Sequence, residues 1–163
     1  MPHRCYNEKF HERQPQNSDC RVCEEWLNYS NFKKWYDENI YGVGDETMDL
    51  DKDILFKGNK VYNPDCCVFI PHSINTLFLN GKKNRGDLPI GVYFDKGKGK
   101  YSACIASSGK SIKLGTFGNA IDAFNKYKEC KENLVKKLAE QYRTKVPYKV
   151  YLAMMEWQIE ITD

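Results

Sequence analysis

Residues 91–117 contain the pattern that most restricts how this chain can fold. Polar and apolar residues alternate there, and the alternation is interrupted twice, by DKGKGK at 95–100 and by SSGKS at 107–111. Both interruptions supply glycine, which tight hairpins need because their backbone takes positive φ values. The pattern predicts three antiparallel strands, at about 91–94, 100–106 and 112–116.

A long amphipathic helix is predicted to follow these strands. Asn119 suits its N-cap, with Asp122 three residues later. Apolar residues then recur at helical spacing from Ala120 to Tyr142, which gives one face that can cover the sheet. Pro147 ends the stretch, and the apolar residues after it predict a short final helix.

The N-terminal half has a less regular pattern. CRVCEEW (20–26) indicates a strand that leads into a loop, and Ser30 is expected to cap a helix. MDLDKDILF (48–56) predicts a strand and KGNKVYNPD (57–65) a turn. CCVFIPHSINTLF (66–78) predicts a strand that breaks at Pro71 into a short helix.

Charge divides the chain into an acidic and a basic part. Residues 1–80 hold nine Lys and Arg against thirteen Asp and Glu, a net charge of −4. Residues 81–113 hold eight against two, a net charge of +6. Gly, Asn and Asp cluster between them ahead of a proline, which is typical of a linker. We therefore expect two modules and an extension: 1–80, a linker at 81–87, 88–145 and 146–163.

Composition restricts the cellular setting. No apolar run in the 163 residues reaches membrane-spanning length, and residues 1–15 lack the apolar core of a signal peptide. The seven cysteines are an odd number, which favours reduced thiols over a disulfide framework. The expectation is a soluble cytoplasmic protein with no membrane partner.

The basic part resembles a known class of DNA-binding domain. IGVYF, GKYSACI, KLGTF and AIDAFNKY follow one another between about 88 and 142. Their spacing is similar to the Apetala-two/ethylene-response-factor type, whose three-stranded sheet lies in the DNA major groove. The resemblance implies double-stranded DNA as a partner.

Basic and aromatic residues of the meander are the candidate DNA contacts. A β-ribbon fits the major groove, and cations that neutralise phosphates release counterions. Where the family usually carries base-reading arginines, this chain has Tyr93, Asp95 and Ala106. Lysine lacks the planar fork of arginine, so we expect affinity with weak or altered sequence preference. The candidate residues are Tyr93, Lys96, Lys98, Lys100, Tyr101, Lys110 and Lys113.

The N-terminal part resembles the ββα-metal core of phage-encoded HNH homing endonucleases. The similarity lies in LDKDILFKGNKVYNPDCCVFIPHSIN and in the upstream RCYNEKF and CEEWLNYSNFKKW. Members of that family often carry a C-terminal Apetala-two-like domain. The two resemblances imply an α+β chain: an HNH-like ββα-metal module, then a three-stranded antiparallel sheet packed on a long helix, then a short C-terminal helix.

The residues at the catalytic positions of the HNH family differ in this chain. Lys52 follows Asp51 where the resemblance implies the general-base histidine, Cys66 replaces the central asparagine, and Asn75 is retained. A protonated lysine cannot accept a proton from water, and neighbouring Asp51 and Asp53 keep it protonated. If the chain cleaves DNA, Asp51 and Asn75 are expected to bind or orient the metal, and Lys52 to contact phosphate.

Two metal sites remain open alternatives. Asp49, Asp51 and Asp53 share one strand face, which suits Mg²⁺ or Mn²⁺ held by Asp51 and Asp53, or simply a charged edge strand. Cys20, Cys23 and Cys66 can form a structural zinc site or serve as small buried hydrophobes. His72 is the only histidine nearby in sequence and is interpreted as a loop residue.

Two functions follow from these features. The first is a DNA-binding protein of the HNH-endonuclease family, working in the cytoplasm of a phage-infected bacterium, with doubtful catalytic competence. The second is a non-catalytic phage protein whose acidic N-terminal module binds a basic host protein, for example to inhibit a defence nuclease in an anti-CRISPR-like way.

Overall fold

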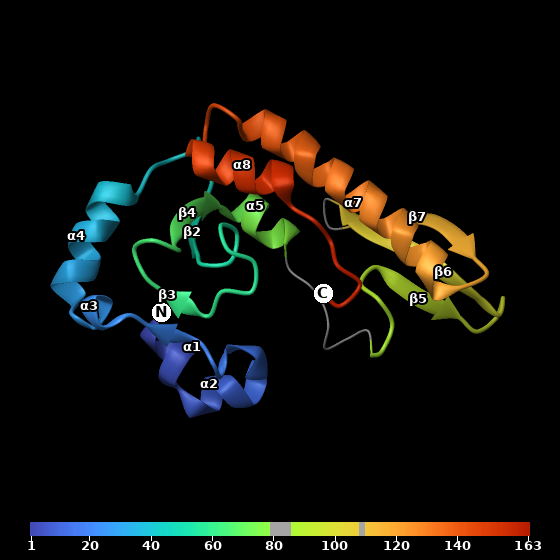
Figure 1. Ribbon diagram of the computed structural model, residues 1–163, viewed down its shortest axis with the longest axis horizontal. Coiled ribbons are helices and arrows are strands. Elements are labelled where there is room, and N and C mark those ends of the chain that lie inside the picture. The colour runs from blue at the N-terminus through green and yellow to red at the C-terminus, as the bar shows by residue number, and fades with distance from the viewer. Residues whose placement is uncertain (79–85, 108–109) are drawn as a thin grey trace. The chain divides into compact units, whose positions relative to one another are not determined.

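The computed structural model describes residues 1–78, 86–107 and 110–163, with Gln16, Ser107 and Lys110 described by their backbone only. The chain forms two compact units (Figure 1). The first comprises 1–76 and 144–153, and the second 77–143 and 154–163. The α+β class and the three-stranded sheet with its long helix are confirmed.

The first unit is built from short elements. In chain order they are α1 (Pro2–Tyr6), α2 (Glu8–Arg13), the 3-10 turn η1 (Pro15–Asn17), β1 (Arg21–Val22), α3 (Glu24–Leu27), α4 (Tyr29–Asn39), β2 (Met48–Asp51), β3 (Val61–Tyr62), β4 (Val68–Pro71) and α5 (His72–Leu77). Strands β1 and β3 pair in parallel, and β2 and β4 pair antiparallel. Along the chain, β3 lies between the paired strands β2 and β4, and α5 follows β4 directly.

Cysteine and aromatic side chains form the core of the first unit. Three of the seven cysteines, Cys5, Cys20 and Cys67, are buried there with Trp26 and Tyr62. All seven are unpaired thiols. Burial raises the pKa of the Cys67 thiol to about 12, so this sulfur stays protonated and acts as a small hydrophobe.

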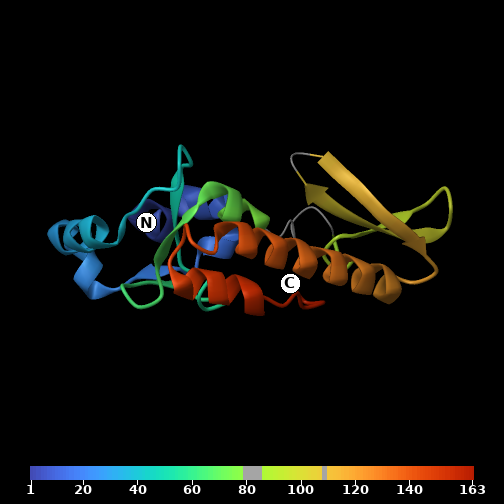
Figure 2. The ribbon, with the colours of Figure 1, turned by 90° about the horizontal axis from the view of Figure 1, so that it is seen from above.

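The second unit contains the predicted meander and helix. Strands β5 (Val92–Asp95), β6 (Lys100–Ser107) and β7 (Lys110–Phe117) form one antiparallel sheet in that order. Helix α7 (Ala120–Tyr142) runs along one face of the sheet (Figures 1 and 2). Asn119 caps α7, because its side chain accepts a hydrogen bond from the Asp122 backbone N–H.

Close packing joins the sheet to its helix. Val92, Ala103 and Ile105 are buried against Phe124 and Tyr127 of α7. Just before β5, the backbone of Gly91 has φ +75°, and a Cβ atom there would lie 2.1 Å from Tyr127. Only glycine accepts both this backbone conformation and this approach, so Gly91 sets how closely α7 covers the sheet.

The C-terminal residues belong to the two units rather than to a separate extension. Helix α8 (Tyr148–Glu156) has its first residues in the first unit, and 154–163 lie in the second. Ile159 is buried in the core of the second unit. Its backbone is fixed to α7, because Ile159 N–H donates to Glu132 and the Lys128 ammonium donates to the Ile159 carbonyl.

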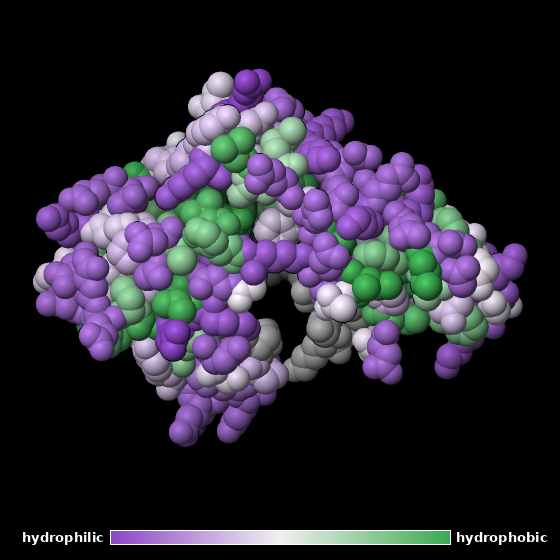
Figure 3. Space-filling view, in the orientation of Figure 1, coloured by the Kyte–Doolittle hydropathy of each residue, from purple (hydrophilic) through white to green (hydrophobic). Residues whose placement is uncertain are grey.

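Domain boundaries differ from those expected. The division between the units falls at 76/77, earlier than the expected linker at 81–87, of which only 86 and 87 lie within the described residues. Among the described residues, no helix has the length and apolarity to cross a membrane. The face drawn in Figure 3 is mostly hydrophilic, with its hydrophobic side chains in separate patches.

Candidate functional site

The face of the sheet opposite α7 is polar and built from small side chains. Strand pairing aligns Tyr93 with Ser102 and Ser102 with Thr116, so these three form one row across the sheet. Two further register pairs, Lys113 with Cys104 and Lys100 with Asp95, lie on the same face of the sheet because side chains alternate along each strand. We call this surface the outer face. Of the side chains just named, Tyr93, Lys100, Lys113 and Thr116 are exposed on it, whereas Ser102 is fully buried.

Most of the predicted DNA contacts lie on or beside the outer face. Tyr93, Lys100 and Lys113 are exposed on it. Lys96 and Lys98 are exposed in the β5–β6 turn, where the Lys98 N–H donates to the Asp95 carbonyl. The backbone of Lys110 begins β7, and its side chain lies outside the described part of the structure.

Tyr101 differs from the other predicted contacts. It pairs with Phe94 on β5 and Phe117 on β7, and its ring lies 5.0 Å from that of Phe94. Its side chain packs against the core beneath α7. Tyr101 is therefore on the helix side of the sheet, because successive strand residues face opposite ways. We leave it out of the interface.

Lys52 is engaged inside the first unit. Only 7% of the residue is exposed. Its Nζ atom donates to Asp53 Oδ2 and to the Asn59 carbonyl oxygen, each at 2.7 Å, and lies 5.8 Å from the centre of the Tyr62 ring. These contacts hold the loop between β2 and β3 and leave the ammonium group little access to a phosphate.

Asp51 and Asp53 are used by the same loop. Asp51 Oδ1 accepts hydrogen bonds from the backbone N–H groups of Asp53 and Ile54, at 2.8 and 2.6 Å. Burial raises the pKa of the Asp51 carboxyl. Asp53 pairs with Lys52. Both carboxylates thus have structural partners within the loop.

Asn59 closes this loop, a role that the sequence analysis missed. Its side-chain amide donates to the carbonyl oxygens of Lys52 and Val61, and its Oδ1 accepts from the Val61 N–H. Gly58, Asn59 and Lys60 indicated a turn in the sequence, but the Lys52 carbonyl lies seven residues away, and its contact with Asn59 depends on the folded loop.

The structure brings Asn75 to Asp49 rather than to Asp51. Asn75 Nδ2 and His72 Nδ1 both donate to Asp49 Oδ2, at 2.8 and 2.7 Å. Burial alone would raise the pKa of Asp49, but these two hydrogen bonds lower it below its usual value. The His72 side chain is 61% exposed. We refer to these three residues as the Asp49 cluster; the sequence analysis had interpreted His72 as a loop residue.

The predicted metal ligands do not gather in the described structure. Within residues 1–78, 86–107 and 110–163, no three His, Cys, Asp or Glu side chains form a group that could hold a metal ion. Of the zinc candidates, Cys20 is buried in the first core, and Cys23 and Cys66 are half-buried. The zinc and the divalent sites stay predictions.

Comparisons of the chain with protein-family models, with curated proteins and with solved structures find no match.

Proposed function

We propose that this protein binds double-stranded DNA through the outer face of the β5–β6–β7 sheet and the adjoining β5–β6 turn. The contrast between the two faces of this sheet is the observation that supports the proposal most. One face of the sheet is buried under α7, while the other combines small side chains with exposed Lys100 and Lys113. A sheet with this surface can enter the major groove, which is about 12 Å wide.

The charge of the region supports phosphate contact. Lys96, Lys98 and Lys100 follow one another at every second position along the turn between two strands. None of the three has an ion-pair partner within the described residues. Unpaired ammonium groups can neutralise DNA phosphates and gain the entropy of counterion release. The proposal therefore places the main affinity in charge contacts.

We expect the protein to discriminate only weakly among DNA sequences. Lysine binds as a point charge and lacks the bidentate geometry with which arginine recognises guanine. Among the described side chains of the outer face, Tyr93, Ser111 and Thr116 are exposed and offer hydroxyl groups toward base edges, whereas Ser102 is fully buried. We propose a protein that binds duplex DNA with modest discrimination among sequences.

We propose that the first unit is related to HNH endonucleases but does not use Lys52 to cleave DNA. Strands β2 and β4 pair as an antiparallel hairpin interrupted by β3, and α5 follows β4, which supports the proposed relationship to a ββα core. Lys52, Asp51 and Asp53 are engaged with one another or with the loop, which argues against their acting on a phosphate. Plasmid cleavage with Mg²⁺ or Mn²⁺ tests this proposal: nicking lost in a Lys52→Met or Asp51→Asn variant that remains folded by circular dichroism, but kept in Lys33→Ala, would contradict it.

DNA binding is tested by removing three lysines of the interface. The variant Lys98→Ala/Lys100→Ala/Lys113→Ala is expected to bind a 20-bp duplex more weakly. The plot of log K against log salt should flatten by about 0.9 for each lost phosphate contact. Fluorescence anisotropy at several NaCl concentrations measures both quantities.

A matched variant controls for net charge. Lys9→Ala/Lys136→Ala/Lys137→Ala removes the same charge from exposed positions on α2 and α7. It should keep a slope close to that of the unaltered protein. If both triple variants bind DNA equally weakly, or if the salt slope of the Lys98/Lys100/Lys113 variant is unchanged, the outer face is not part of the DNA interface.

A further inference from the structure

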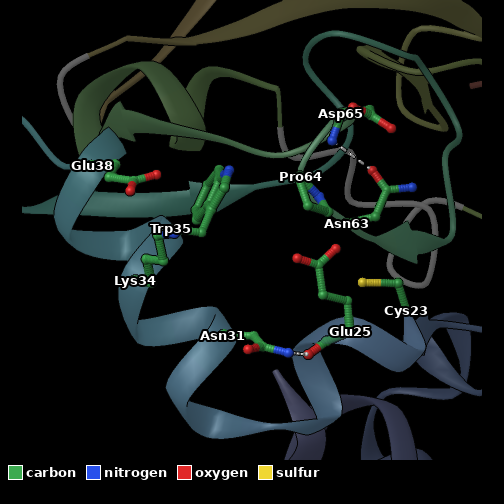
Figure 4. A pocket seen from close by; sticks show the side chains of 9 residues that line it. All are labelled: Cys23, Glu25, Asn31, Lys34, Trp35, Glu38, Asn63, Pro64 and Asp65. Atoms are coloured by element: carbon green, nitrogen blue, oxygen red, sulfur yellow. Dashed lines mark hydrogen bonds between the residues drawn. The ribbon is translucent and has the colours of Figure 1, made fainter.

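A hollow in the first unit has the chemistry of a cation-binding site. Its volume is about 590 Å³, and it lies between α3, α4 and the loop that precedes β4 (Figure 4). Glu25 and Cys23 contribute from the α3 side, and Lys34, Trp35 and Glu38 from α4. The facing wall is the loop Asn63–Pro64–Asp65.

Unpaired carboxylates give this hollow a negative field. Glu25, Glu38 and Asp65 are exposed, and within the described residues none of their carboxylates has a hydrogen-bond or ion-pair partner. Lys34 is the one cation among the lining residues, so the lining carries three negative charges and one positive charge. Walls of low dielectric concentrate such a field and favour a positively charged ligand.

The side chain of Trp35 gives the hollow an aromatic wall that is held in place. Its ring packs against Trp26, with centroids 4.6 Å apart, and against Phe69 at 5.5 Å. An indole is the best aromatic partner for a cation, and a planar guanidinium can also stack on it. Carboxylates combined with an indole thus favour arginine over a plain ammonium group.

Two asparagines leave one donor and one acceptor beside the charges. Asn31 Nδ2 donates to the Glu25 carbonyl, which leaves its Oδ1 atom for another donor. Asn63 Oδ1 accepts from the N–H groups of Asp65 and Cys66, which leaves its Nδ2 atom for another acceptor. A peptide backbone offers one N–H and one C=O for each residue, which fits this pair.

We propose that this hollow docks an arginine of a basic segment in a protein partner. The guanidinium lies over Trp35 and between the carboxylates of Glu25, Glu38 and Asp65, while the neighbouring backbone meets Asn31 and Asn63. A hollow of this volume is larger than one guanidinium group requires, which favours a peptide over a small cation. The site is independent of the proposed DNA contacts, since phosphates would be repelled by its carboxylates.

The proposal is tested with the full chain and a defined probe. The probe is an acetylated, amidated heptapeptide of sequence Gly-Gly-Arg-Ala-Arg-Gly-Gly, compared with the same peptide carrying neutral citrulline in place of arginine. Calorimetry measures affinity, and NMR follows the three indole N–H signals, assigned by single Trp→Phe variants. We expect the Trp35 signal to shift with the arginine peptide and to remain still with the citrulline peptide.

Charge removal at the hollow supplies the decisive comparison. Glu25→Gln/Glu38→Gln/Asp65→Asn is expected to weaken the arginine peptide about tenfold, since each exposed ion pair contributes modestly. The matched control Glu8→Gln/Glu12→Gln/Asp45→Asn removes the same charge from exposed positions outside the lining and should bind like the unaltered protein.

Four outcomes would overturn the proposal, and the first three concern the variants and the peptide. They are equal weakening in the two charge variants, equal binding of the citrulline peptide, and binding that moves another indole signal instead of that of Trp35. Tighter binding of spermidine than of the peptide would assign the hollow to a small cation and also overturn it. Duplex binding, measured separately, is expected to be unchanged by the peptide, so the two proposals can fail independently.

Discussion

At the scale of single residues, partners decide what a charged side chain can do. Lys52 donates to Asp53 and to the Asn59 carbonyl, and Asp51 accepts two backbone N–H groups. By contrast, Lys33 pairs with Asp37 on the surface of α4, with about half of each side chain exposed. In the Lys52–Asp53 pair only the lysine is buried, with 8% of its side chain exposed against 44% for Asp53, so the structural weight of Lys52 lies mainly in its contacts inside the loop.

Removing Lys52 is expected to destabilise the first unit. Lys52→Ala leaves the Asn59 carbonyl without its donor and removes a buried aliphatic stem, which together cost about 2–4 kcal/mol in the free energy of unfolding. Lys52→Met, which keeps most of the stem, should cost less. Urea unfolding measures both, with Lys33→Ala as the control within about 0.5 kcal/mol. Similar values for Lys52→Ala and Lys33→Ala would contradict the structural role of Lys52.

The Asp49 cluster predicts a pH-dependent contribution to stability. The pKa of Asp49 is lower in the folded protein than in the unfolded chain. Its stabilising effect is therefore fully present above the unfolded pKa of about 4 and is lost as the pH falls through the lower folded value.

Asn75→Ala tests this contribution directly. The variant should raise the pKa of Asp49 and cost about 1–2 kcal/mol at pH 7, because a hydrogen bond to a carboxylate is lost. The cost should shrink below about pH 4 as Asp49 becomes protonated. NMR titration of the carboxyl carbon and urea unfolding at pH 7 and pH 3 supply the readouts. A cost that does not vary with pH would show that Asn75 acts through packing alone.

At the scale of elements, the packing of the sheet on α7 depends on the close approach of the Gly91 backbone to the Tyr127 ring. Gly91 immediately precedes β5, and its position against Tyr127 lets the strand end lie under the helix. The register of the three strands then places the apolar residues under α7 and Tyr93, Lys100 and Lys113 on the outer face. An altered approach at Gly91 would disturb the surface proposed to bind DNA.

Gly91→Ala is expected to destabilise the second unit by about 3 kcal/mol or more. The added methyl group meets the Tyr127 ring, and alanine disfavours a φ of +75°. Gly118→Ala is the matched control, because nothing lies within 4 Å of its added Cβ and its φ is outside the left-handed region. Thermal unfolding followed by circular dichroism compares the two. A small effect at Gly91 would mean that Tyr127 can move aside without cost.

At the scale of the whole chain, the C-terminal residues link sequence-distant segments within each unit. Residues 144–153 belong with 1–76, and residues 154–163 belong with 77–143. Val150 and Met154 on α8 are both fully buried, and Ile159 lies in the second core. The first unit is therefore built from two separated stretches of chain, and so is the second.

Ile159→Ala tests whether the C-terminal residues are part of the second core. Removing this buried side chain should lower the free energy of unfolding by about 2–4 kcal/mol. Ile161→Ala, two residues later and 47% exposed, is the control and should change it by less than about 1 kcal/mol. Hydrogen exchange should show faster exchange in α7 for the first variant only. Equal, small effects would make the C-terminal residues a dispensable extension.

The sequence by itself determined the local elements of this protein. Turn glycines, alternation and the Asn119 cap are signals within a few residues, so the three strands and α7 follow from them. The start of α4 was shifted, because Asn28 rather than Ser30 accepts the capping hydrogen bond. Both residues suit an N-cap, and only the folded backbone distinguishes them.

Only the tertiary structure decided which side chains meet. Asp49 rather than Asp51 reaches Asn75 because β2 pairs with β4 and α5 follows immediately. Lys52 became an internal donor because the loop folds over it, and Tyr101 faces α7 because of strand register. The hollow lined by Glu25, Trp35 and Asp65 joins residues forty positions apart. Such contacts depend on chain segments brought together by folding, which composition and periodicity do not encode locally.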